Sequence, residues 1–278
     1  MFENNFKINY TMKKFTLVAC LMLLGVIAFA QKPVRFGVYL GEATPLGAMG
    51  QGDAIKKTPE HIYGDLTHYA MLSEKGDQGY ASIGANVGFD VTVALPVEGL
   101  GVFGGIDFFI NSNKNDVRDC FEEWSHEIVK QGNVSSAKFY LPNVMNIPIL
   151  FGLNYLHNFN NIVGVWGEAG IGPNFRLISD FKFETKYTAL VVTPEGDYDV
   201  TTETYDYDAA TTLGFKIGAG VMLWNKMSIG LDYYSLGSSK INANYKVKAG
   251  DRVVIEDKFK GENDIYTGEL VVRVGYHF

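Results

Sequence analysis

The segment Ala81–Leu95, which reads ASIGANVGFDVTVAL, decides the fold class of this 278-residue chain. Its side chains alternate between two kinds from one position to the next. The first set, mostly apolar, is Ala81, Ile83, Ala85, Val87, Phe89, Val91, Val93 and Leu95. The second set, mostly small or polar, is Ser82, Gly84, Asn86, Gly88, Asp90, Thr92 and Ala94. A period of two residues places the sets on opposite faces of an extended chain, so the segment is predicted to be a β-strand.

Seven further segments show the same alternation, and together with the first they predict an all-β protein of eight strands. They are residues 34–41, 100–110, 140–156, 162–177, 209–223, 227–242 and 265–278. Two of them give a weaker signal, because Pro148 and Pro173 cannot donate a backbone hydrogen bond to a central ladder.

The connections between these segments alternate in length. The short ones are residues 96–99, 157–161 and 224–226, and the long ones are about 42–79, 111–139, 178–208 and 243–264. Bacterial outer-membrane barrels have short turns on the periplasmic side and long loops outside. An even number of strands also closes the barrel without an unpaired edge in lipid. The predicted fold is therefore an eight-stranded antiparallel up-and-down transmembrane β-barrel with long external loops.

A soluble calyx would show the same alternation, so the composition of the two faces has to decide between the alternatives. The polar face here is small and rich in glycine, which suits the crowded interior of a narrow barrel whose apolar face meets lipid. This favours the membrane barrel. The aromatic residues expected in its interfacial girdles are Phe36, Tyr39, Trp166, Trp224, Tyr233 and Tyr276.

The N-terminal region predicts export. Residues 12–31 read MKKFTLVACLMLLGVIAFAQ, with two lysines, an apolar stretch and a small-x-small pattern before a cleavage between Ala30 and Gln31. Residues 1–30 are therefore predicted to be an extension and signal peptide starting at Met12, and residues 31–278 one outer-membrane barrel domain. Lipidation at Cys20 is a weaker alternative, because only two apolar or neutral residues separate Lys14 from its cleavage box.

Charge and cysteine content argue against nucleic-acid binding and against stabilisation by a disulfide. The formal net charge of −7 becomes −9 after cleavage, because three lysines and one glutamate are lost. An acidic chain lacks the basic surface that nucleic-acid binding needs. Only Cys120 remains after cleavage, so no intramolecular disulfide is expected.

The chain resembles a known family at its C-terminus and in three internal motifs. It ends VGYHF at Phe278, with Tyr276 before it, which resembles the C-terminal insertion signal of outer-membrane proteins. The internal motifs are IPILFG at 147–152, EAGIGP at 168–173 and GAGV at 218–221. The chain is similar to Bacteroidetes outer-membrane β-barrel proteins of the PorT family. The resemblance implies an outer-membrane location, insertion by the barrel-assembly machinery, and an envelope or secretion protein as partner.

Seven charged residues are expected at similar depth on the inward face of the barrel. They are Arg35, Asp90, Asp107, Glu168, Lys216, Asp232 and Arg273. Buried charges need partners, so a salt-bridged plug is the leading interpretation and a gated conduit for ions or protons is the alternative.

No catalytic, metal or cofactor site is predicted. His61 and His68 share the first external loop, but a zinc site needs three or four ligands in tetrahedral reach. Ser125 and His126 are neighbours in sequence, which rarely produces a nucleophile–base pair. An outer-membrane lipid-modifying enzyme is therefore the third interpretation.

Two external connections carry additional patterns. Residues 116–130 show helical spacing of apolar side chains and predict a short amphipathic helix on the barrel rim, with Cys120 packed in it. Residues 178–208 are acidic and rich in tyrosine, and the alternation of TETYDY at 202–207 predicts strands that continue beyond the membrane. The leading functional prediction is a non-enzymatic outer-membrane barrel whose external loops serve structural, binding or secretion-accessory roles; the alternative is a narrow channel.

Overall fold

The computed structural model describes residues 34–51, 80–192, 196–261 and 264–278, and eight of its strands form a closed antiparallel barrel. Around the barrel the strand order is β1-β13-β10-β9-β6-β5-β3-β2. The strands are β1 (Val34–Leu46), β2 (Gly84–Ala94), β3 (Leu100–Asn111), β5 (Val144–Asn158), β6 (Val163–Ile178), β9 (Ala210–Leu223), β10 (Met227–Ser239) and β13 (Ile265–His277). The sequence-based prediction of eight antiparallel strands in a closed barrel is confirmed.

The outer surface of the barrel is apolar on every strand. One outward residue from each, in chain order, is Leu40, Phe89, Phe108, Leu153, Ile171, Ile217, Leu231 and Val272, all between 39% and 64% exposed. On each strand the alternate positions point inward and most of them are buried, which follows from the two-residue period of a strand. A calyx with Ile83 and Phe89 in its interior is excluded, because both side chains are exposed on the outside.

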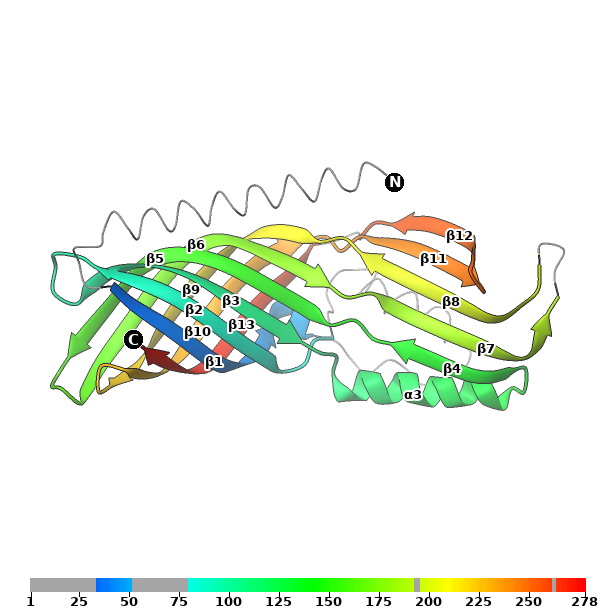
Figure 1. The fold of residues 1–278 in the computed structure, drawn as a ribbon, viewed down its shortest axis with the longest axis horizontal. Coiled ribbons are helices and arrows are strands. Elements are labelled where there is room, and N and C mark those ends of the chain that lie inside the picture. Colours follow the sequence, from blue (N-terminus) through cyan, green and yellow to red (C-terminus); the bar gives the residue numbers. More distant parts are fainter. Residues whose placement is uncertain (1–33, 52–79, 193–195, 262–263) are drawn as a thin grey trace.

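Five strands form a second, open sheet beyond one end of the barrel (Figure 1). They are β4 (Val134–Tyr140), β7 (Phe181–Val191), β8 (Tyr198–Tyr207), β11 (Ala243–Ala249) and β12 (Arg252–Phe259). Their order, β12-β11-β8-β7-β4, repeats that of β13-β10-β9-β6-β5, the barrel strands to which they are joined in sequence. The open sheet therefore continues one side of the barrel wall.

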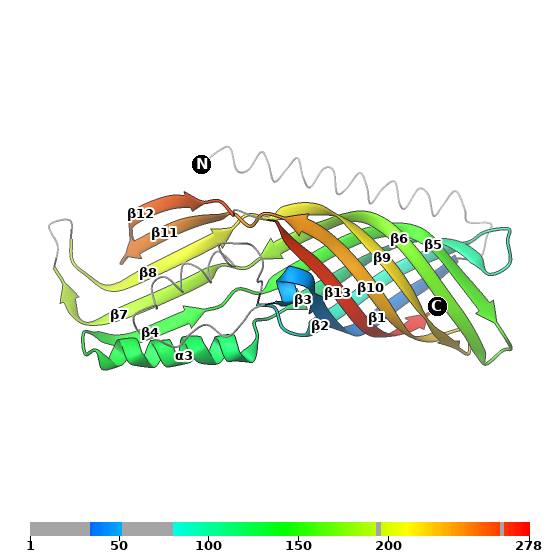
Figure 2. The ribbon, with the colours of Figure 1, turned by 180° about the vertical axis from the view of Figure 1, so that it is seen from behind.

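The other three barrel strands do not continue into this sheet. β1 is followed by a 3₁₀ turn, η1 (Gly47–Gly50), and β3 is followed by helix α3 (Asn115–Lys130), which lies along β4 (Figures 1 and 2). Short turns and the C-terminus lie at the opposite end of the barrel (Figure 1). The predicted helix and the strands predicted at 202–207 are confirmed, whereas β4, β11 and β12 lie in segments that were predicted as connections without strands.

Two apolar clusters form the core, one in each part. The outer cluster lies between α3, η1 and the open sheet, and includes Phe121, Trp124, Phe181 and Tyr205. The inner cluster lies within the barrel and comprises Ala43, Phe103, Phe109, Leu150, Tyr234, Leu236 and Val271. No helix in the described ranges is both long enough and apolar enough to cross a membrane.

Three further sequence-based predictions can be compared with the structure, and one of them is wrong. Pro148 and Pro173 lie within central barrel strands, and backbone pairing around them is interrupted without a change of register. Tyr39 and Trp166 were expected in the outer aromatic girdles, but both point into the barrel and are at most 5% exposed. The predicted signal peptide, with Ala30 and Gln31, lies outside the described residues, as do His61 and His68.

Candidate functional site

The centre of the barrel holds a buried cluster of four charged side chains from four strands. The Lys216 Nζ lies 2.6 Å from Oε1 of Glu168, and the Arg273 Nη2 donates to the same oxygen at 2.5 Å. The Arg273 Nε lies 2.6 Å from Oδ2 of Asp232. All four side chains are at most 4% exposed. Glu168 thus pairs with both cations, and Asp232 pairs with Arg273. The two carboxylates together balance the two positive charges.

Aromatic rings enclose this cluster. The guanidinium carbon of Arg273 lies 4.2 Å from the centre of the Tyr39 ring and 4.6 Å from that of Trp166. The Lys216 Nζ lies 5.1 Å from the Tyr234 ring. Such cation–π contacts strengthen when water is excluded, as it is from these buried groups. The inward positions of Tyr39 and Trp166 therefore have an electrostatic reason.

The remaining three residues of the predicted network occupy different surroundings. The Tyr39 hydroxyl donates to Oδ2 of Asp90, and Nδ2 of Asn86 lies 3.5 Å from Oδ1 of Asp107. Arg35 lies at the barrel end that carries the short turns and makes no ion pair with a described residue. The structure therefore brings together four of the seven predicted residues, places two aspartates beside neutral donors, and leaves Arg35 apart.

Several inward polar residues were not among the predicted site residues. Glu269 is fully buried and forms no ion pair with a described residue. Nη1 of Arg176 donates to the Ile265 carbonyl and to Oγ1 of Thr267, both at 3.2 Å, near the rim that meets the open sheet. Both residues lie at inward positions of the alternation, which is the signal that could have identified them.

The inner apolar cluster lies between the charged cluster and the rim, together with polar side chains such as the buried Glu269, which the strand register pairs with Tyr234. Phe109 and Tyr234 meet edge to face with ring centres 4.8 Å apart, and both are completely buried. Leu150 and Leu236 lie in the same cluster and are at most 1% exposed. The described interior thus contains paired charges at one level and closely packed apolar and polar side chains at the next.

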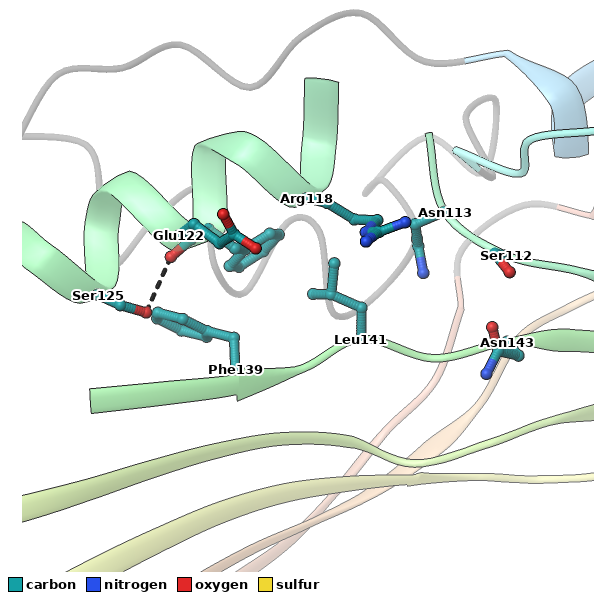
Figure 3. Close-up of a pocket in the computed structure, with 9 residues that line it drawn as sticks. Ser112, Asn113, Arg118, Glu122, Ser125, Phe139, Leu141 and Asn143 are labelled. Atoms are coloured by element: carbon teal, nitrogen blue, oxygen red, sulfur yellow. Dashed lines mark hydrogen bonds between the residues drawn. The ribbon is translucent and has the colours of Figure 1, made fainter. Parts of the chain in front are cut away.

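A cavity of about 290 Å³ lies outside the barrel between α3 and the end of β4 (Figure 3). Arg118, Glu122 and Ser125 line it from the helix, and Phe139 and Leu141 from the opposite side. The Ser125 hydroxyl donates to the Phe121 carbonyl at 3.0 Å. The Ser125 hydroxyl therefore directs its proton to the helix backbone and not to His126.

The open sheet carries tyrosines from two of the segments predicted to be external, 178–208 and 243–264. The Tyr245 hydroxyl donates to Oε2 of Glu203 at 2.9 Å, and burial together with this carboxylate raises the pKa of Tyr245 above its usual value. Burial also raises the pKa of Tyr207. Among the described residues no three potential metal ligands lie close enough together to hold an ion.

Comparisons with known proteins find similarity to solved structures of outer-membrane proteins. The chain matches no protein-family model, and no curated protein matches it. Three solved structures similar to it are Ail, the attachment invasion locus protein of Yersinia pestis (11% identity, TM-score 0.36, covering 88% of this chain and 98% of Ail), a major outer membrane protein from Thermus thermophilus (10%, 0.41, 88% and 100%) and OprG from Pseudomonas aeruginosa (11%, 0.40, 89% and 97%).

Proposed function

We propose that this chain is a non-enzymatic integral outer-membrane protein whose barrel is a closed anchor for an external binding platform, formed by the open sheet and α3. The observation that carries the proposal is the distribution of polarity across the barrel wall. All eight strands expose large apolar side chains outward, and the groups inside are charged or closely packed. Lipid outside and a filled interior account for both facts.

The alternative of a narrow channel fits the interior less well. A conducting path needs open space along the barrel, whereas Phe109 and Leu236 are completely buried in close packing between the charged cluster and the rim. The ion pairs among Glu168, Lys216, Asp232 and Arg273 also use the charges that would attract ions. A structural plug is therefore the favoured role of the cluster.

The platform is the part available for partners. Helix α3 and the five-stranded sheet have an apolar core of their own, so they hold a fixed shape above the rim. The sequence resemblance to PorT-family barrels favours an envelope or secretion protein as the partner. Loss of a secreted protein from the medium after deletion of the gene, restored by the intact gene, would support this accessory role.

A cysteine-labelling experiment tests location and orientation together. In a Cys120→Ala background, Glu127→Cys places a thiol on the exposed side of α3, and Lys226→Cys places one in the short turn after β9. A membrane-impermeant maleimide is expected to label the first variant in intact cells and the second only after permeabilisation. Labelling of Lys226→Cys in intact cells, or a protein recovered in the soluble fraction, would refute the proposed arrangement.

A further inference from the structure

The barrel end opposite the platform contains a second cavity, of about 680 Å³. Arg35 of β1, Thr92 of β2 and Asn154 of β5 line it from the barrel wall, and the turn at 95–99 closes one side. Leu100 and Leu156 contribute apolar surface. Its volume lies within the range of small-molecule sites, which are typically apolar with a few placed polar groups.

Two donors in this cavity lack a partner. The Nε of Arg35 and the Oγ1 of Thr92 are buried atoms that neither donate nor accept a hydrogen bond. The register pairs Arg35 directly with Thr92, so the two groups lie at the same level of the wall. Buried polar atoms are nearly always satisfied, and two unsatisfied neighbours that can both donate indicate a missing acceptor.

Arg35 differs from the other inward cations in the partners that surround its charge. Lys216 and Arg273 are paired with carboxylates, and Arg176 is bonded to backbone and hydroxyl oxygens. Among the described residues, none forms an ion pair with Arg35. A planar guanidinium matches the two oxygens of a carboxylate, and a single cation balances a single negative charge.

We propose that this cavity binds an amphiphilic monoanion, whose carboxylate contacts Arg35 and Thr92 and whose apolar part contacts Leu100 and Leu156. Glu98, in the turn that lines the cavity, is exposed to solvent and opposes the binding of an anion. The site lies at the barrel end away from the platform, so it is independent of the binding role proposed for that surface.

The test uses octanoate as the probe and the full-length barrel in lipid nanodiscs, with empty nanodiscs subtracted. Calorimetry is expected to show saturable binding that Arg35→Gln weakens about tenfold or more and Thr92→Val weakens several-fold. Glu98→Gln is expected to tighten binding. Arg252→Gln, which changes an exposed arginine of the open sheet, is the matched control and should bind as wild type does.

Three comparisons can overturn the proposal. If octanol binds as tightly as octanoate, the negative charge of the ligand does not contribute to binding. If acetate binds as tightly as octanoate, the apolar lining does not contribute. Octanoate binding that is absent, or unchanged in Arg35→Gln, would refute the site itself. Far-UV circular dichroism establishes that each variant is folded. Calorimetry does not depend on how the protein is oriented in the cell. It can therefore support the binding site even if the labelling experiment refutes the proposed location and orientation.

Discussion

Glu168 forms ion pairs with two buried cations, Lys216 and Arg273. The charge balance inside the barrel therefore depends on this residue. Glu168→Gln keeps the size of the side chain but leaves Lys216 and part of the Arg273 charge without a partner. Breaking a buried ion pair costs about 3–5 kcal/mol, so we expect the free energy of unfolding to fall by about that amount. Urea unfolding of the barrel in lipid vesicles measures the change.

Two further variants provide a control at an exposed ion pair and a partial rescue of the buried one. Glu127→Gln removes an ion pair with Lys130 whose side chains are 48% and 69% exposed, so it is expected to cost less than about 1 kcal/mol. Adding Lys216→Met to Glu168→Gln removes one of the unpaired cations and should restore part of the lost stability. Equal effects of Glu168→Gln and Glu127→Gln would contradict the assignment of a buried cluster.

Position 218 has no room for a side chain, because Asp232 occupies the space beside Gly218. A Cβ at Gly218 would lie 2.8 Å from Cγ of Asp232, and moving that carboxylate would weaken its contact with Arg273. Gly218→Ala is therefore expected to lower the free energy of unfolding by about 1–3 kcal/mol.

Gly167 provides the matched control for Gly218, because its position has room for a methyl group. A Cβ there would have as its nearest neighbour the Gly218 carbonyl oxygen at 3.7 Å. Gly167→Ala should change stability by less than about 1 kcal/mol. Unfolding curves that show the same loss for both alanine variants would count against crowding at Asp232.

At the scale of elements, the barrel strands could be predicted because each has an outward face made mostly of apolar residues. In β13, Val272, Val274 and Tyr276 alternate with inward residues without interruption, and the predicted range of 265–278 differs from the strand by one residue. In β12, by contrast, the run Val253, Val254, Ile255 is exposed throughout and shows no clean alternation. An edge strand in water has no buried face, so its periodicity carries no signal.

The candidate site could be predicted only in part, for a reason that lies in tertiary geometry. Alternation assigns Glu168, Lys216, Asp232 and Arg273 to the inward face, and the structure places them in contact. It cannot show that Tyr39 and Trp166 belong beside Arg273, because aromatic residues occur on both sides of a barrel wall. Nor can it show that Asp90 faces a tyrosine hydroxyl, since that depends on how adjacent strands are staggered.

Helix α3 yields a prediction about accessibility. Cys120 is completely buried against the open sheet, in the same cluster as Phe121 and Trp124. In folded protein we expect a maleimide to react with Cys120 far more slowly than with the thiol of Glu127→Cys in a Cys120→Ala background, which lies on the exposed side of the helix. In urea the two rates should converge. Mass spectrometry of timed samples measures both, and rapid labelling of Cys120 without denaturant would show that α3 is not packed as described.

At the scale of the whole molecule, the continuous strand order links the two parts mechanically. Five of the eight barrel strands lead into the open sheet in the same sequence around the wall, so the platform is an extension of the barrel itself. Helix α3 follows β3, one of the three strands that end at the rim, and its apolar side packs on the sheet. The position of the open sheet relative to the barrel is thus set by the barrel wall, which suits the proposed role of this sheet as a platform presented in a fixed orientation.

The filled interior predicts that the protein does not conduct ions. In planar bilayers wild type is expected to show no open state, because ion pairs occupy the centre of the barrel and the buried Phe109, Tyr234 and Leu236 help to fill the next level. Asp232→Ala removes a partner of Arg273 but leaves Phe109, Tyr234 and Leu236 in place, so it should also stay closed. Reproducible conductance steps from wild type that disappear in Asp232→Ala would contradict the plug and favour the channel instead, because they would show that ions pass beside that carboxylate.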